Sequence, residues 1–117
     1  KSSLNDMLTY LKVNLGLIEN TLEDAIDLAH QEHFNVGTVS YDDRPGEVYE
    51  LTIGLGWHKH QCSDGRTYYR HGGNTNGHSA YIGFDKSALT GAIVLCNYED
   101  INIYNFGDKI LEAINKY

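Results

Sequence analysis

The spacing of the apolar residues changes part-way along this chain, and that change constrains the fold more than any other feature. Helical spacing joins four leucines near the start, Leu4, Leu8, Leu11 and Leu15. From Glu47 to Trp57, every second residue is a large apolar one, which is typical of a half-buried antiparallel strand. The chain is therefore expected to keep its helices and its antiparallel sheet in separate segments.

Two helices are predicted in residues 1–35. Ser3 stands where a cap residue belongs, with an acid three residues on, and Thr21 repeats this arrangement. Gly16 stands where a C′ glycine ends the first helix. Residues 36–46 hold a glycine, two adjacent aspartates and the single proline, so they are predicted to form a surface connection.

Residues 47–117 are predicted to form the sheet and a C-terminal helix. Short clusters of Asp, Ser and Gly separate the strands, which are expected at 47–57, 66–73, 78–84 and 89–97. Helical spacing returns from about Ile101 to the end. The predicted fold class is α+β, an antiparallel meander flanked by two N-terminal helices and one C-terminal helix. A length of 117 residues allows one domain with one modest core.

Charge and composition exclude several classes of partner. The formal net charge of −7 leaves no basic surface to hold a nucleic-acid backbone. No apolar run approaches the ~20 residues that a membrane span needs. Two cysteines, Cys62 and Cys96, do not define a disulfide framework, although one bridge between them stays open.

The stretch from His71 to Ser79 is the most unusual part of the sequence. It holds three glycines, two asparagines and two histidines between two predicted strands. Glycine, and next to it asparagine, tolerates positive φ, and glycine also lets something lie close to the backbone. Two interpretations are open: a long hairpin loop, or a strand whose exposed edge and following loop line a site.

Several short motifs resemble, in order and spacing, the C-terminal part of the serine β-lactamase-like and penicillin-binding-protein family. The resemblance is to the branch of class C β-lactamases, D-alanyl-D-alanine carboxypeptidases, D-aminopeptidases and esterases. The motifs are Ser3-x-x-Asp6-Met7, Gly54-Leu55-Gly56-Trp57, His71-Gly72-Gly73-Asn74-Thr75-Asn76-Gly77, Ile82-Gly83-Phe84-Asp85 and Ala92-Ile93-Val94-Leu95-Cys96-Asn97.

The resemblance implies roles for the glycine-rich stretch. In the family, a Lys-Thr-Gly or His-x-Gly motif lies on the strand at the edge of the active site. By that match, His71 would help hold the substrate and the hydrogen bonds around the catalytic Ser, Lys and Tyr. The backbone N–H of Asn74 would be an oxyanion-hole donor. By the same match, the neighbouring positions would bind substrate: Gly72, Gly73, Thr75, Asn76 and Gly77. No metal or other cofactor is implied.

Two further motifs of the family are missing from this sequence. None of the six serines is followed by lysine three residues on, and no Tyr-x-Asn occurs. Since both motifs come earlier in family members, we expect this chain to be the C-terminal fragment of a longer hydrolase and to be inactive alone. The resemblance implies a small-molecule or peptide substrate and a periplasmic or extracellular parent. Histidine in place of the motif lysine favours a peptidase or esterase over a dedicated β-lactamase.

Two alternative functions stay open, and the resemblance has one structural consequence. The chain could come from a non-catalytic relative that keeps the cleft for binding or regulation. It could instead be a small domain that binds a metal or ligand through His58, His60 and Cys62. If the first strands of the family sheet are missing, the strand at 89–97 has a free apolar edge, which predicts self-association.

Overall fold

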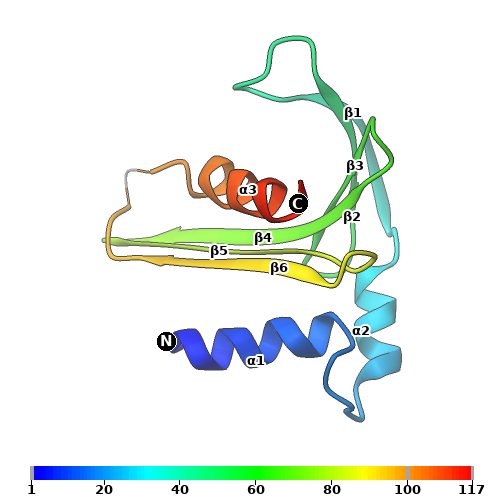
Figure 1. The fold of residues 1–117 in the computed structure, drawn as a ribbon, viewed down its shortest axis with the longest axis vertical. Coiled ribbons are helices and arrows are strands. Elements are labelled where there is room, and N and C mark those ends of the chain that lie inside the picture. The colour runs from blue at the N-terminus through cyan, green and yellow to red at the C-terminus, as the bar shows by residue number, and fades with distance from the viewer. Residues whose placement is uncertain (1, 100, 117) are drawn as a thin grey trace.

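The computed structural model describes residues 2–99 and 101–116 as an α+β fold (Figure 1). Three helices and six strands follow one another as α1 (Leu4–Asn14), α2 (Glu23–His30), β1 (Phe34–Ser40), β2 (Val48–Ile53), β3 (His58–Cys62), β4 (Thr67–Thr75), β5 (His78–Asp85), β6 (Thr90–Cys96) and α3 (Ile103–Ile114). The strands form one antiparallel sheet in the order β1-β2-β3-β4-β5-β6. The predicted fold class and meander are confirmed.

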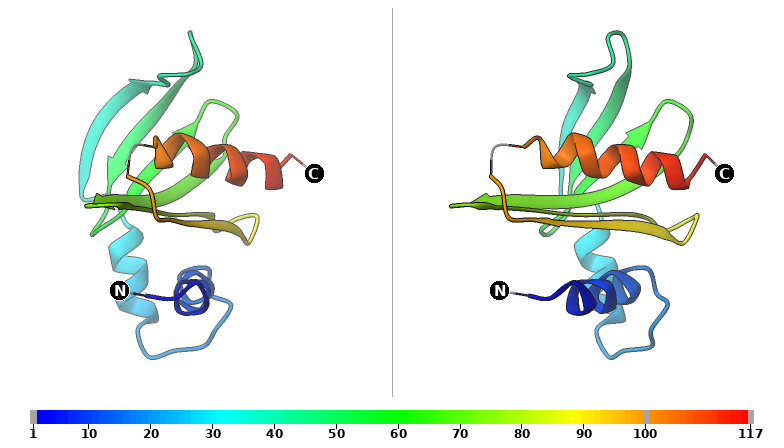
Figure 2. Two further views of the ribbon diagram at one scale, coloured as in Figure 1. Left: turned by 90° about the vertical axis from the view of Figure 1, so that its left-hand side faces the viewer. Right: turned by 60° about the vertical axis from the view of Figure 1, so that its left-hand side comes forward.

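The helices cover both faces of the sheet. Figure 1 shows α3 above the strands β4 to β6 and α1 below them, while β1, β2 and β3 curl upwards at one end. The two turned views in Figure 2 show the same layers, with α2 on the same side as α1. The helix α3 packs on β5 and β6, and α1 packs on β6.

The cap predicted at Thr21 was wrong, since α2 has Leu22 at its N-cap and no side-chain cap hydrogen bond, whereas the signals around α1 act as predicted. The Ser3 hydroxyl accepts the Asp6 backbone N–H at 3.2 Å, and the Asp6 carboxylate accepts the Ser3 N–H at 3.1 Å, which completes a capping box. At the other end of α1, Gly16 has φ +73° and donates to the Val13 carbonyl, while Leu17 donates to the Lys12 carbonyl. This is the paired hydrogen bonding of a glycine-terminated helix.

One strand was missed in the sequence. Residues 36–46 were predicted as a surface connection, yet β1 occupies Phe34–Ser40 and pairs with β2. The prediction was wrong because the apolar spacing of Phe34 and Val36 breaks before Val39, so no regular alternation reveals the strand, and none of its residues is buried. Gly37, at φ +97°, lies where the register between the two strands shifts, which is the place of a β-bulge.

The predicted strand at 47–57 ends at Ile53, and the strand β3 at His58–Cys62 was not predicted. A turn separates β2 from β3, because the Gly54 N–H donates to the Trp57 carbonyl at 2.8 Å and Gly56 has φ +79°. A Cβ on Gly54 would lie 2.3 Å from the Ala29 carbonyl oxygen, so only glycine fits against the end of α2. The alternation of apolar residues runs through this turn and conceals it.

Two apolar clusters form the core, one on each face of the sheet. The cluster on the α1 face contains Leu11, Leu15, Trp57, Ile82 and Phe84. The cluster on the α3 face contains Tyr68, Tyr81, Ala92, Ile103 and Leu111. The last residue of the predicted C-terminal helix, Tyr117, lies outside the described residues. None of the helices in the part of the chain that the structure describes is both long and apolar enough to span a membrane.

Candidate functional site

The glycine-rich stretch is mostly strand, not loop. The strand β4 continues to Thr75, and β5 begins at His78, so only Asn76 and Gly77 lie between them. Gly77 has φ +78°, which an ordinary side chain would disfavour. Of the two interpretations of the sequence, the long hairpin loop is wrong, and His71 to Thr75 belong to an extended strand.

Half of β4 has a strand neighbour on one side only. Its pairing with β3 runs from Thr67 to Arg70, whereas its pairing with β5 continues to Thr75. In Figure 1, β4 extends beyond β3, which curves away. Within the described residues, the segment from His71 to Thr75 therefore has an open edge, where alternate backbone N–H and C=O groups have no strand partner.

His71 lies on the face of the sheet opposite to α3. Adjacent residues of a strand point to opposite faces, and Arg70 reaches Asp108 on α3. His71 is exposed, and its ring centroid is 5.6 Å from that of His58. Partial burial lowers the pKa of His58, and the neighbouring His71 and Arg70 lower it further, so His58 is neutral at pH 7. An exposed imidazole thus stands beside the open edge.

The two glycines after His71 have different surroundings. A Cβ on Gly72 would lie 2.9 Å from the Ala80 carbonyl oxygen and 3.1 Å from the Tyr104 ring. A Cβ on Gly73 would have no heavy atom within 4 Å. Gly72 is therefore needed for packing inside this chain, whereas Gly73 leaves open space on the His71 side.

The end of the hairpin is tied to the segment that follows β6. The Gly77 N–H donates to the Glu99 carboxylate at 2.5 Å, and the buried Ser79 hydroxyl donates to the Tyr98 carbonyl at 2.8 Å. Asn74, Thr75 and Asn76 are exposed between His71 and this anchor, so all seven residues from His71 to Gly77 lie along one edge and turn.

A polar network supports β4 from the α3 face. The Arg70 guanidinium pairs with Asp108, and its Nε donates to His60 Nε2 at 2.8 Å. The Tyr81 hydroxyl donates to the other oxygen of Asp108 at 2.8 Å. The Tyr104 hydroxyl donates to the Gly72 carbonyl at 2.9 Å, which links the network to the His-x-Gly segment.

Burial and neighbouring charges shift the pKa values of two groups in the network. Burial and the Arg70 charge lower the pKa of His60 to about 3, so His60 is neutral and accepts the Arg70 N–H. Burial raises the pKa of Asp108, although Arg70 and Tyr81 partly oppose the shift. The network was not predicted from the sequence. Its one local signal is an acid, Asp108, beside the apolar positions with which α3 faces the sheet.

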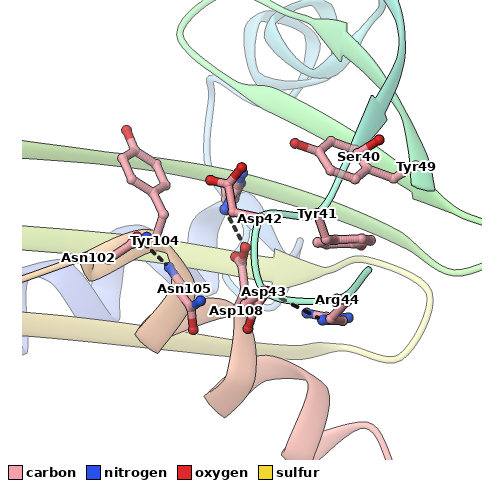
Figure 3. Close-up of a pocket in the computed structure, with 11 residues that line it drawn as sticks. Ser40, Tyr41, Asp42, Asp43, Arg44, Tyr49, Asn102, Tyr104, Asn105 and Asp108 are labelled. Atoms are coloured by element: carbon pink, nitrogen blue, oxygen red, sulfur yellow. Dashed lines mark hydrogen bonds and ion pairs between the residues drawn. The ribbon is translucent and has the colours of Figure 1, made fainter. Parts of the chain in front are cut away.

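A polar cavity of about 80 Å³ borders this network on the α3 face (Figure 3). It lies between the β1–β2 connection and α3. Its lining contains Tyr41, Asp42, Arg44, Tyr49, Tyr104, Asn105 and Asp108, among others. Ion pairs join the two walls, from Arg44 to Glu112 at 2.6 Å and from Lys109 to Asp43 at 2.9 Å. The cavity is separate from His71, which lies on the other face.

The structure does not bring together the three side chains considered for a metal site. His60 is engaged by Arg70, and the Cys62 sulfur lies 3.4 Å from the Tyr41 hydroxyl oxygen. His58 faces His71 instead. Among residues 2–99 and 101–116, no three His, Cys, Asp or Glu side chains are grouped to hold a metal ion. Both cysteines are free thiols.

Comparison with known proteins identifies the family. The family model described as Beta-lactamase matches residues 1–113, which is nearly the whole chain and includes the open edge of β4. None of the solved structures matches the chain. Since the family match covers both the helical segment and the complete sheet, the chain belongs to the β-lactamase family.

Proposed function

We propose that this chain forms the sheet wall of a serine hydrolase active site. The observation that carries the proposal is the open edge of β4 from His71 to Thr75, which lies beside the exposed imidazole of His71. An amide or ester lying along such an edge can exchange backbone-like hydrogen bonds with it. Gly73 leaves the space that this approach needs.

The roles within the wall follow from this placement. His71 contacts the substrate and orients the groups around the reacting serine. The backbone N–H of Asn74 donates to the oxyanion, an interaction worth ~3 kcal/mol where such a donor is preorganised. Gly72, Gly73, Thr75, Asn76 and Gly77 shape the remaining contact surface. Asn74 and Asn76 stand where the family often has glycine, so this surface presents two extra amide side chains.

The nucleophile comes from elsewhere in the complete protein. A Ser-x-x-Lys segment supplies the serine that forms the seryl ester, and the lysine helps to deprotonate it. A Tyr-x-Asn segment completes the site. The proposed substrates are D-amino-acid peptides or small esters, with β-lactams as the third class, in a periplasmic or extracellular protein. This chain alone forms the wall without turnover.

The test compares this chain with the complete protein. Both are assayed with a chromogenic ester and a chromogenic cephalosporin, and intact mass is measured after treatment with a fluorophosphonate. We expect no adduct on the chain alone, and an adduct with hydrolysis in the complete protein. An adduct on the isolated chain would place the nucleophile among its six serines and overturn the proposal.

A matched pair of variants of the complete protein tests His71. His71→Ala is expected to lower kcat/KM at least tenfold, because it removes the imidazole beside the open edge. His33→Ala removes another exposed histidine, which bonds to the Leu28 carbonyl on the α2 side, and is expected to keep kcat/KM. Equal activity of the two variants would contradict the role of His71. Binding of substrate without hydrolysis by the complete protein would instead identify a non-catalytic relative.

A further inference from the structure

We infer that Tyr104 is a positioning residue, which holds the Gly72–Gly73 peptide and thereby aims the Asn74 N–H at the oxyanion. The inference rests on the proposed function for its catalytic consequence, but the holding of the peptide can be measured without catalysis. Tyr104 comes from α3, on the far side of the sheet from His71, and sequence reasoning gave it no role.

The strand needs such support at this point. Gly72 and Gly73 are consecutive glycines, which have the greatest backbone freedom of any residues. Beyond Arg70 the strand β4 no longer pairs with β3, so β5 is its only strand neighbour within the described residues. A free edge and two glycines together leave the peptide plane weakly fixed just before Asn74.

Tyr104 supplies the missing contact in two ways. Its hydroxyl donates to the Gly72 carbonyl at 2.9 Å. Its ring covers Gly72 so closely that a Cβ there would lie 3.1 Å from the ring. Residues two apart in a strand direct their backbone groups to the same side, so the Asn74 N–H points the same way as the carbonyl that Tyr104 holds.

Tyr104 is itself held in place. The Arg70 guanidinium lies 4.9 Å from its ring centroid, and the Tyr81 ring meets it edge-on, with a centroid distance of 6.3 Å. Arg70 is fixed in turn by Asp108 and His60. The hydroxyl is therefore preorganised, because the groups around it are locked by their own contacts.

Tyr104→Phe tests the inference because it keeps the ring and removes only the hydroxyl. The first readout is the NMR order parameters of the Gly73 and Asn74 amides in this chain. We expect them to fall from the value of about 0.85 of rigid backbone towards about 0.6. The control is Tyr98→Phe, which alters an exposed ring and is expected to leave both order parameters unchanged.

The second readout is the activity of the complete protein. Tyr104→Phe is expected to lower kcat about tenfold to a hundredfold with KM unchanged, since small misplacements of a donor have effects of that size. If Tyr104→Phe hydrolyses substrate at the wild-type rate and leaves the order parameters unchanged, the inference about Tyr104 is overturned, while the proposed function stands. If the order parameters fall but the wild-type complete protein hydrolyses none of the substrates, the proposed function fails while the holding of the peptide by Tyr104 stands.

Discussion

Replacing each of the two glycines after His71 by alanine should change stability in opposite directions. At Gly72 the new Cβ would lie 2.9 Å from a backbone oxygen and 3.1 Å from the Tyr104 ring. Crowding of this kind costs about 1–3 kcal/mol, and displacement of the Tyr104 hydroxyl would lose about 1 kcal/mol more. Alanine restricts the unfolded chain, which returns about 0.4–1 kcal/mol. Gly72→Ala should therefore lower the free energy of unfolding by about 2 kcal/mol.

At Gly73 only the restriction of the unfolded chain by alanine applies, and this stabilises the folded state. No heavy atom lies within 4 Å of the new Cβ, and the backbone there does not have positive φ. Gly73→Ala should therefore raise the free energy of unfolding by about 0.5–1 kcal/mol. The two variants differ by one methyl group at adjacent positions, so composition and unfolded state are matched.

Urea unfolding of this chain measures the difference. A gap of about 2–3 kcal/mol separates the midpoints by about 1 M or more, since m is typically about 1–3 kcal/mol/M for small proteins. In the complete protein, Gly73→Ala should then lower hydrolysis in spite of its greater stability, because its methyl group enters the space beside His71. Equal midpoints for the two variants would refute the assignment of Gly72 to packing and Gly73 to open space.

Two further predictions concern acid and association. The buried His30 has a pKa lowered to about 4 from the ordinary 6.5, mainly by burial and then by the Lys86 charge, and the pKa of His60 falls to about 3. As the pH falls, the unfolded chain therefore takes up protons before the folded chain does. The stabilising effect of the neutral histidines is complete above pH 6.5 and is lost as the pH falls towards 4, by about 3 kcal/mol in the free energy of unfolding for His30 alone. Equal urea midpoints at pH 7 and pH 4.5 would contradict this prediction. The strand β6 lies at one edge of the sheet and carries the exposed Leu95. We therefore expect light scattering to find self-association of the chain, which Leu95→Lys weakens. A monodisperse wild-type monomer at high concentration would count against this prediction.

The parts of the fold that were predicted have local signals. The capping box at Ser3, the glycine after α1 and the turn clusters that separate β4, β5 and β6 each depend on residues close in sequence. The strand β1 was missed because its apolar spacing breaks at the bulge near Gly37. The β2–β3 turn was missed because Gly54 and Gly56 fit the alternation on either side. In both cases tertiary pairing, not local pattern, decides the structure.

The candidate site also has a part that was predicted from the sequence and a part that was not. The stretch from His71 to Gly77 was recognised from its motif, and the structure places all of it along one edge and turn. The supporting network was not predicted, because its contacts join residues far apart in sequence: Arg70 with Asp108, and Gly72 with Tyr104. Nor does the motif reveal that β3 ends its pairing at Arg70, which leaves the edge open.

The alternation of β4 has a consequence for the kinds of sequence change this protein can accept. Arg70 and Gly72 serve the α3 face, while His71 and Gly73 serve the opposite face. A shift of one residue in a strand moves every side chain to the other face. Deleting or inserting a single residue between Tyr69 and Thr75 would bury the His71 imidazole under α3 and expose the Arg70 guanidinium. Relatives should therefore differ in this segment by substitution, and changes of length should be confined to the turn at Asn76 and Gly77.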